Sequence, residues 1–173
     1  MTEPDEDARA LLAALGARGW SLAVAESLTG GLVVATIVSV PGASAVLRGG
    51  VIAYATDLKH SLLGVDADLL ARHGAVHPDV ARAMAEGVRA AAGRDGVPAD
   101  VGIATTGVAG PDPQDGQPVG TVFIAVATPV DTRLEALALE GDRAEIRAAA
   151  VRHALRSARD CVEGADASGE ASG

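Results

Sequence analysis

Apolar residues recur along the chain with two different periods. Leu11, Leu12 and Leu15 recur at helical spacing, and similar patterns predict further helices, whereas short apolar runs bounded by turn residues predict strands. The predicted helices cover residues 5–18, 29–39, 57–63, 67–72, 78–93 and 142–162. The predicted strands cover residues 21–26, 50–55, 100–105, 119–128 and 132–139. Strands that alternate with helices are typical of an α/β fold.

The segments between the predicted strands indicate how the strands are arranged. The first three strands are joined through helices, which predicts parallel strands with right-handed crossovers. Residues 107–118 are rich in Gly, Pro and Asp, and residues 129–131 form a short link, so both predict hairpins that make the fourth strand antiparallel to its neighbours. We therefore expect a three-layer α/β/α sandwich around a mixed five-stranded sheet with the strand order 2-1-3-4-5.

Composition narrows the class of protein. Hydrophobic residues make up 49% of the 173 residues but aromatic residues only 2%, so Ala, Val and Leu must fill the core. The sequence has no apolar run of membrane-spanning length, and its N-terminus is acidic. The single cysteine, Cys161, agrees with a reducing compartment. We therefore expect a cytoplasmic protein without a membrane partner. A net charge of −9 without a basic cluster argues against a nucleic-acid partner. We expect one domain over residues 1–162 and a disordered, Gly-, Ala- and Ser-rich tail over residues 163–173.

Polar and Gly-rich segments gather at one edge of the predicted sheet. Because the first three strands are parallel and the fourth is reversed, the segments after strands 1, 2, 3 and 5 all reach this edge. The edge includes the switch point between strands 1 and 3, where α/β proteins commonly bind ligands. The segments carry Ser27, Thr29, Gly30, Gly31, Tyr54, Lys59, Thr106, Gly107, Gly110 and Arg143.

Ser27 is a candidate nucleophile that needs a base. None of the four histidines stands in an obvious triad order, although His77 lies near a Gly-rich turn. Lys59, the only lysine in the chain, can act as the base if burial or a nearby cation lowers its pKa. Tyr54 could relay or orient the proton, or it could pack on the sheet as a strand-end aromatic residue.

The turn after the first strand offers a second kind of chemistry. A helix that begins near Thr29 would present free backbone N–H groups to a substrate phosphate, or to the oxyanion formed when Ser27 attacks a carbonyl group. The simpler interpretation is that Ser27 or Thr29 caps this helix.

Two arginines at the start of the last predicted helix, Arg143 and Arg147, fall on its apolar face. The later arginines of this helix fall on the opposite, solvated face. A buried arginine needs an anionic partner, which is either a carboxylate such as Glu26 or a phosphate or carboxylate on a ligand. We favour a ligand for at least one of the two.

The sequence lacks the common motifs for metals and nucleotide cofactors. It contains no pair of cysteines and no H-E-x-x-H motif, and Asp112 and Asp115 stand where turn residues are expected. The Gly-rich segments match neither G-x-G-x-x-G nor the Walker A pattern. We therefore expect no metal and no cofactor.

Six segments of the chain resemble, in the same order, the C-terminal domain of the competence/damage-inducible protein CinA. They are AESLTGG, GGVIAYATDLKHSLLGV, HGAV, TTGVAGPD, PVGTVFIAVA and GDRAEIR, and the resemblance covers residues 5–162. Stand-alone members of this family are known as nicotinamide-nucleotide amidases. The resemblance implies an α/β/α fold and a metal-free hydrolysis of nicotinamide mononucleotide to nicotinate mononucleotide and ammonia, in pyridine-nucleotide salvage.

The resemblance also implies roles for individual residues. Ser27 matches the nucleophile of the A-E-S-x-T-G-G motif, and Lys59, five positions after Tyr54, matches the base of a Ser–Lys pair. Thr106-Gly107 and Gly110-Pro111 align with the S-G-x-A-G-P turn, and Arg143 aligns with the arginine of G-D-R. The catalytic residues are thus expected to be Ser27, Lys59 and Tyr54. The expected substrate-binding residues are Thr29, Gly30, Gly31, Thr106, Gly107, Gly110, Arg143 and Arg147.

The chain departs from the family pattern at three places. His77 stands where many members have serine, Thr106 replaces the usual serine, and Pro113-Gln114 replaces a Gly-Gly pair. These departures bear on substrate preference more than on the Ser–Lys chemistry.

The expected partner is a small-molecule nucleotide substrate, and a homodimer is expected. The alternative is a non-catalytic module that binds a nucleotide or a protein and is linked to competence or DNA damage. An intact Ser27 and Lys59 favour the enzyme, because a binding module need not keep that pair. Longer family members carry an N-terminal pyrophosphatase-like domain, which we do not expect in this chain.

Overall fold

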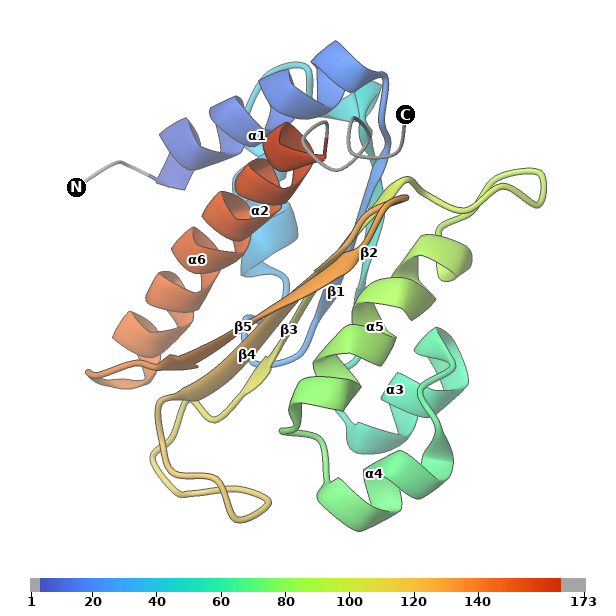
Figure 1. Ribbon diagram of the computed structural model, residues 1–173. Helices are drawn as coiled ribbons and strands as arrows, with labels where there is room; N and C mark the ends of the chain where they lie inside the picture. The colour runs from blue at the N-terminus through green and yellow to red at the C-terminus, as the bar shows by residue number, and fades with distance from the viewer. Residues whose placement is uncertain (1–3, 166–173) are drawn as a thin grey trace.

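The computed structural model describes residues 4–165 of the chain (Figure 1). The α-helices are α1 (Pro4–Arg18), α2 (Leu32–Val38), α3 (Thr56–Leu63), α4 (Ala67–His73), α5 (Pro78–Ala91) and α6 (Arg143–Gly164), with a 3-10 helix, η1, over Ala43–Ala45. The strands are β1 (Leu22–Glu26), β2 (Leu47–Ile52), β3 (Val101–Gly107), β4 (Thr121–Ala127) and β5 (Thr132–Ala138). The predicted alternation of strands and helices is confirmed.

The five strands form one mixed sheet in the order β2-β1-β3-β4-β5. β1 pairs in parallel with β2 and β3, and β4 pairs antiparallel with β3 and β5, as the connections predict. Glu26, the last residue of β1, lies opposite Ile52 of β2 and Thr105 of β3. The three parallel strands therefore end at the same edge of the sheet, which is the edge that carries the candidate residues.

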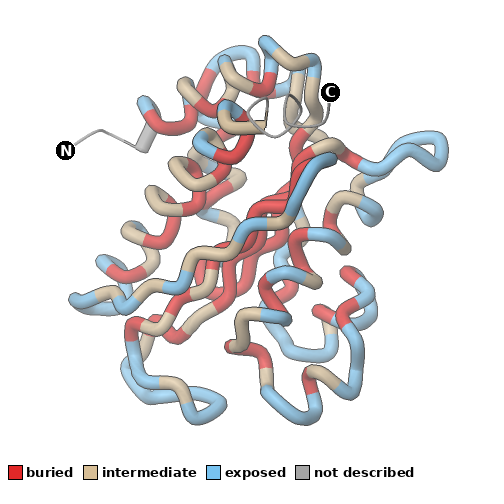
Figure 2. Tube along the Cα trace, in the orientation of Figure 1, coloured by how far each residue is buried: buried red, intermediate tan, exposed pale blue. Residues whose placement is uncertain are grey.

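Helices cover both faces of the sheet: α1, α2 and α6 lie on one face, and α3, α4 and α5 lie on the other (Figure 1). Each face buries its own hydrophobic cluster, and Figure 2 shows how much of the sheet between them is buried. The cluster under α5 is rich in alanine and depends on close backbone approach. A Cβ atom at Gly102 of β3 would clash with the carbonyl of Ala85 in α5, and one at Gly87 would clash with the carbonyl of Leu63 in α3. Close contact between small residues thus replaces the aromatic packing that the composition lacks.

Several element boundaries differ from the sequence-based expectation, among them the start of β2 and the end of α6. β2 begins at Leu47, three residues before the predicted start, because its pairing with β1 already begins opposite Leu22. The register of the neighbouring strand decides this boundary, since the sequence there includes a charged residue and two glycines. α6 continues to Gly164, so the first residues assigned to the disordered tail are helical. The rest of that tail, residues 166–173, lies outside the described residues.

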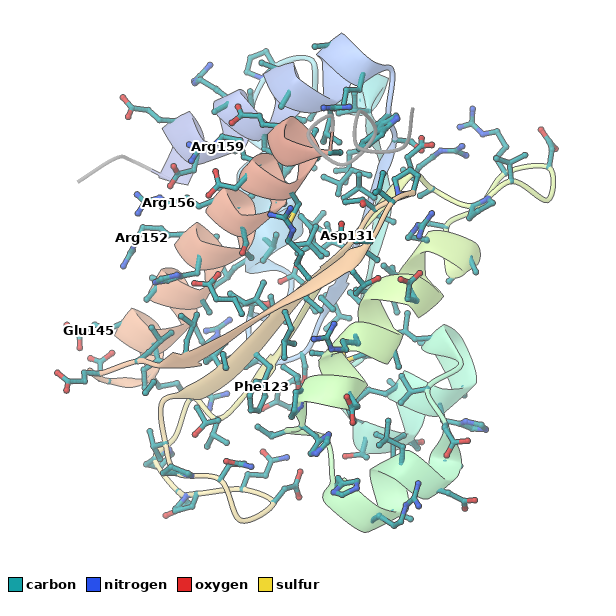
Figure 3. The ribbon with its side chains drawn as sticks, in the orientation of Figure 1. Phe123, Asp131, Glu145, Arg152, Arg156 and Arg159 are labelled. Atoms are coloured by element: carbon teal, nitrogen blue, oxygen red, sulfur yellow. The ribbon has the colours of Figure 1, made fainter. Side chains whose placement is uncertain are left out.

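One of the outer arginines of α6, which the sequence assigns to a solvated face, also joins this helix to α1. Figure 3 shows Arg152, Arg156 and Arg159 on the side of α6 that faces away from the sheet. Arg156 Nε donates to Oδ2 of Asp7 over 2.9 Å, and the Asp7 side chain is only 3% exposed. Arg159 pairs with the neighbouring Asp160. A partly buried ion pair therefore fastens the N-terminal helix to the helix that borders the candidate site.

Candidate active site

A cavity of about 130 Å³ opens at the edge where the parallel strands end. Its wall combines the turn after β1, the segment after β2, the segment before α5, the long β3–β4 loop and the start of α6. The lining residues are Ser27, Leu28, Tyr54, Ala75, Val76, Thr106, Gly107, Val108, Ala109, Gly110, Asp112, Gln114 and Arg143. Six of the residues predicted for the site line this cavity: Ser27, Tyr54, Thr106, Gly107, Gly110 and Arg143.

Lys59 lies directly behind Ser27. Its side chain is fully buried in α3, and its Nζ lies 3.1 Å from Ser27 Oγ. Nζ also donates to the carbonyl of Ala53 over 2.7 Å and, at 3.5 Å, reaches the carbonyl of Tyr54. A neutral amine has two N–H groups for these carbonyls and one lone pair, which is then directed to the Ser27 hydroxyl. The arrangement is that of a nucleophile with an adjacent base.

Burial lowers the pKa of Lys59 from 10.5 to about 8, and the negative charge of Asp115 opposes this shift. The charged form is disfavoured because the ammonium leaves water without gaining a carboxylate hydrogen-bond partner. A substantial fraction of Lys59 is therefore neutral near pH 8, and this is the state that a general base requires.

Glu26 occupies the N-terminus of α2, which the sequence analysis offered to a phosphate or an oxyanion. This carboxylate is fully buried and accepts hydrogen bonds from the backbone N–H groups of Gly31, Val33 and Val34, over 2.9–3.1 Å. The prediction of an anion site at these donors was therefore wrong, and so was the helix start at Thr29, because α2 begins at Leu32. Glu26 is also not the partner of Arg143 or Arg147.

Arg147 holds the turn after Ser27. Its Nε donates to the carbonyl of Leu28 over 2.9 Å, and its Nη2 donates to the carbonyl of Thr29 over 3.0 Å. The Thr29 hydroxyl is buried and pairs with the hydroxyl of Thr105 at 2.8 Å. Arg147 and Thr29 do not belong to the cavity wall. Both instead fix the backbone that carries Ser27.

The turn itself needs glycine at two consecutive positions. Gly30 and Gly31 have φ values of 60° and 99°, a region that other residues rarely adopt. Neither glycine lines the cavity. Among the described residues, the backbone N–H groups of Leu28 and Thr29 make no hydrogen bond, and Leu28 lines the cavity beside Ser27. The N–H group that follows Ser27 is thus a candidate oxyanion donor that the sequence analysis did not identify.

Arg143 and Tyr54 meet at the mouth of the cavity. Arg143 Nη1 donates to the carbonyl of Gly110 over 2.7 Å, and Nη2 donates to the Tyr54 hydroxyl over 3.3 Å. Tyr54 is 61% exposed, so it is not packed into the sheet. The alternative that Tyr54 packs on the sheet as a strand-end aromatic residue was therefore wrong.

The segment before α5 forms a wall that sequence reasoning missed. The Thr106 hydroxyl donates to the carbonyl of Ala75 over 2.7 Å, and the N–H group of Ala75 donates to Asp115 over 2.7 Å. Asp115 is a turn residue, as predicted, with φ of 52°, but it also joins two loops. His77 caps α5 and stacks on His73 with ring centroids 4.2 Å apart, and it does not line the cavity.

Within residues 4–165, no group of three or more His, Cys, Asp or Glu side chains is arranged to hold a metal ion. None of the helices in the same part of the chain is both long and apolar enough to cross a membrane.

Comparison with known proteins gives one consistent family. Residues 5–162 match the CinA C-terminal domain. A CinA-like protein of Frankia casuarinae is 50% identical over 154 residues, which are 89% of this chain and 34% of that protein. A CinA-like protein of Anaeromyxobacter dehalogenans is 49% identical over 158 residues, which are 90% of this chain and 37% of that protein. The chain thus spans about a third of the length of these curated relatives.

Solved structures agree with the sequence comparison. A CinA superfamily protein from Klebsiella pneumoniae superposes with a TM-score of 0.87 and 32% identity, covering 94% of this chain and 99% of that one. A CinA superfamily protein from Escherichia coli gives a TM-score of 0.80 and 30% identity, covering 94% and 93% of the two chains.

Proposed function

The chain belongs to the CinA C-terminal domain family, and we propose that it is a metal-independent amidohydrolase that converts nicotinamide mononucleotide to nicotinate mononucleotide and ammonia. The observation that carries the proposal is the contact of 3.1 Å between Lys59 Nζ and Ser27 Oγ, made by a fully buried lysine behind the serine that lines the cavity. A module that only binds a ligand does not need a serine paired with a lysine of lowered pKa.

The proposed reaction passes through an acyl-enzyme. Neutral Lys59 takes the Ser27 proton while Oγ bonds to the carboxamide carbon, and the carbonyl oxygen becomes an oxyanion within reach of the Leu28 N–H group. The C–N bond then breaks as Lys59 returns its proton to the leaving nitrogen, which departs as ammonia. Water, deprotonated by Lys59, attacks the ester and releases the acid and the Ser27 hydroxyl.

The size of the cavity suits the reacting end of the substrate. Pockets that bury a whole drug-sized ligand occupy roughly 300–1,000 Å³, and this cavity of about 130 Å³ has room for little more than the carboxamide and its ring. The ribose phosphate then extends past the mouth, where Arg143 lies. Action in the cytoplasm as a homodimer, without metal or cofactor, remains a prediction.

The proposal is tested by ammonia release from a panel of amides. The purified chain should release ammonia from nicotinamide mononucleotide and much less from nicotinamide riboside or free nicotinamide, with an equal amount of the matching acid formed. Ammonia release from none of the three would contradict the proposed function.

We expect the rate to depend on pH through Lys59. Because the base acts in its neutral form and burial lowers its pKa to about 8, kcat/KM should rise about tenfold per pH unit below pH 8 and level off above it. The measurement is kcat/KM for nicotinamide mononucleotide between pH 6 and 10. A rate that falls with increasing pH over this range would show that a neutral Lys59 is not the base.

We expect Arg143→Ala to raise KM for nicotinamide mononucleotide about 10- to 100-fold, because a charge-assisted hydrogen bond to phosphate contributes roughly 1.5–3 kcal/mol. KM for the phosphate-free riboside should change much less. Arg152→Ala, on the outer side of α6, is the matched control and should leave both values unchanged (Figure 3).

Arg147→Ala distinguishes the roles of the two arginines that the sequence predicts to bind substrate. Since Arg147 holds the carbonyls of Leu28 and Thr29, its loss should lower kcat for both substrates alike. If Arg147→Ala raised KM for the nucleotide more than KM for the riboside, and Arg143→Ala did not, the phosphate would be assigned to Arg147 instead.

A further inference from the structure

The cavity wall contains a carboxylate that no neighbouring cation neutralises. Asp112 lines the same cavity as Ser27, and its side chain makes no hydrogen bond or ion pair with any residue in the described range 4–165. Arg143, the cation in the same wall, donates to Gly110 and Tyr54 instead. The charge of Asp112 is therefore available to a molecule that enters the cavity.

The loop that carries Asp112 is held on both sides of this residue. On one side, the Gly110 carbonyl accepts from Arg143. On the other side, the backbones of Gln114 and Gln117 pair with each other, and Asp115 accepts from the N–H group of Ala75. Although Asp112 itself is exposed, its backbone lies between two fixed points, which hold this residue in the cavity wall.

A positively charged ring explains why a carboxylate is needed here. Lys59 lies behind Ser27, and its ammonium form repels a cation next to that serine. A carboxylate in the wall offsets that repulsion, and the aromatic ring of Tyr54 at the mouth adds a surface that attracts cations. Arg143, near the mouth, suits a negative group attached to the same molecule. The wall thus offers one charge of each sign to a substrate that carries both.

We propose that Asp112 is a specificity residue that favours a substrate with a positively charged ring over a neutral aromatic amide. This inference rests on the proposed function for the identity of the ring. The charge preference of the cavity is nevertheless a binding property that is measured without turnover.

The test is the binding of two probes that differ in ring charge. One is 1-methylnicotinamide, which is permanently cationic, and the other is nicotinamide, which is neutral; neither carries a phosphate. NMR titration of the Ser27→Ala protein should give a lower Kd for the cation. Adding Asp112→Asn should raise the Kd of the cation about two- to fivefold, as expected for an exposed charge, and leave that of nicotinamide nearly unchanged. Asp68→Asn, which removes an equal exposed charge on α4 away from the cavity, should change neither value.

A turnover experiment separates this inference from the proposed function. In the otherwise unchanged enzyme, Asp112→Asn should lower kcat/KM for nicotinamide mononucleotide and leave that for its dihydro form, which has a neutral ring, nearly unchanged. If neither the mononucleotide nor its dihydro form is hydrolysed, the proposed function is wrong. The binding of 1-methylnicotinamide and nicotinamide still shows whether Asp112 favours a cationic ring. Equal effects of Asp112→Asn on both probes, or no binding of either, would overturn the role of Asp112.

Discussion

Replacing Ser27 with alanine should lower kcat for nicotinamide mononucleotide by about 10⁴- to 10⁶-fold, the loss that follows removal of a nucleophile in an enzyme of this kind. Folding should be unaffected, because only one hydroxyl is removed and its hydrogen-bond partner, Lys59, keeps the carbonyl of Ala53. Ser61→Ala, on the exposed side of the helix that carries Lys59, is the matched control and should retain full activity. The measurement is the initial rate of ammonia release by each purified variant.

Lys59→Met should cause a loss of similar size. Methionine keeps most of the volume of the buried side chain, so the variant loses the base without leaving a large cavity. Because nucleophile and base act as one unit, the double variant should be little slower than either single variant. Losses that multiply in the double variant would show that Ser27 and Lys59 act independently.

Glu26→Ala should lower the free energy of unfolding by about 3–5 kcal/mol, because three backbone N–H groups lose their buried, charged acceptor at once. Urea denaturation measures this change. Glu140→Ala removes an exposed carboxylate and should cost less than about 0.5 kcal/mol. A loss below about 1 kcal/mol in Glu26→Ala would mean that the start of α2 does not depend on this carboxylate.

Most of the fold follows from local signals in the sequence. The Gly- and Pro-rich segment 107–118 and the short link 129–131 are hairpin signals, and they fix the reversed direction of β4. The start of α2 could not be predicted in the same way. It depends on the Glu26 side chain, which folds back from the end of β1 onto the first N–H groups of the helix. From the sequence alone, the hydroxyl groups at 27 and 29 were the more obvious caps.

The positions of site residues could be predicted from the sequence where those residues directly follow a strand. Ser27, Tyr54 and Arg143 follow strands, so the topology alone brings them to one edge of the sheet. The role of Arg147 was not predictable, since it donates to the carbonyl of a residue 119 positions away in the sequence. Asp112 was dismissed as a turn residue for the same reason: nothing local shows that its loop forms a wall of the cavity.

In the proposed function, the Ser27–Lys59 pair hydrolyses the carboxamide of nicotinamide mononucleotide. The most direct measurement is the formation of nicotinate mononucleotide and ammonia by the purified chain in the presence of EDTA, with Ser27→Ala run in parallel. We predict equal amounts of the two products from the unaltered chain and none above background from the variant. Products formed equally by both proteins, formed only after a metal ion is restored, or not formed at all would contradict the claim.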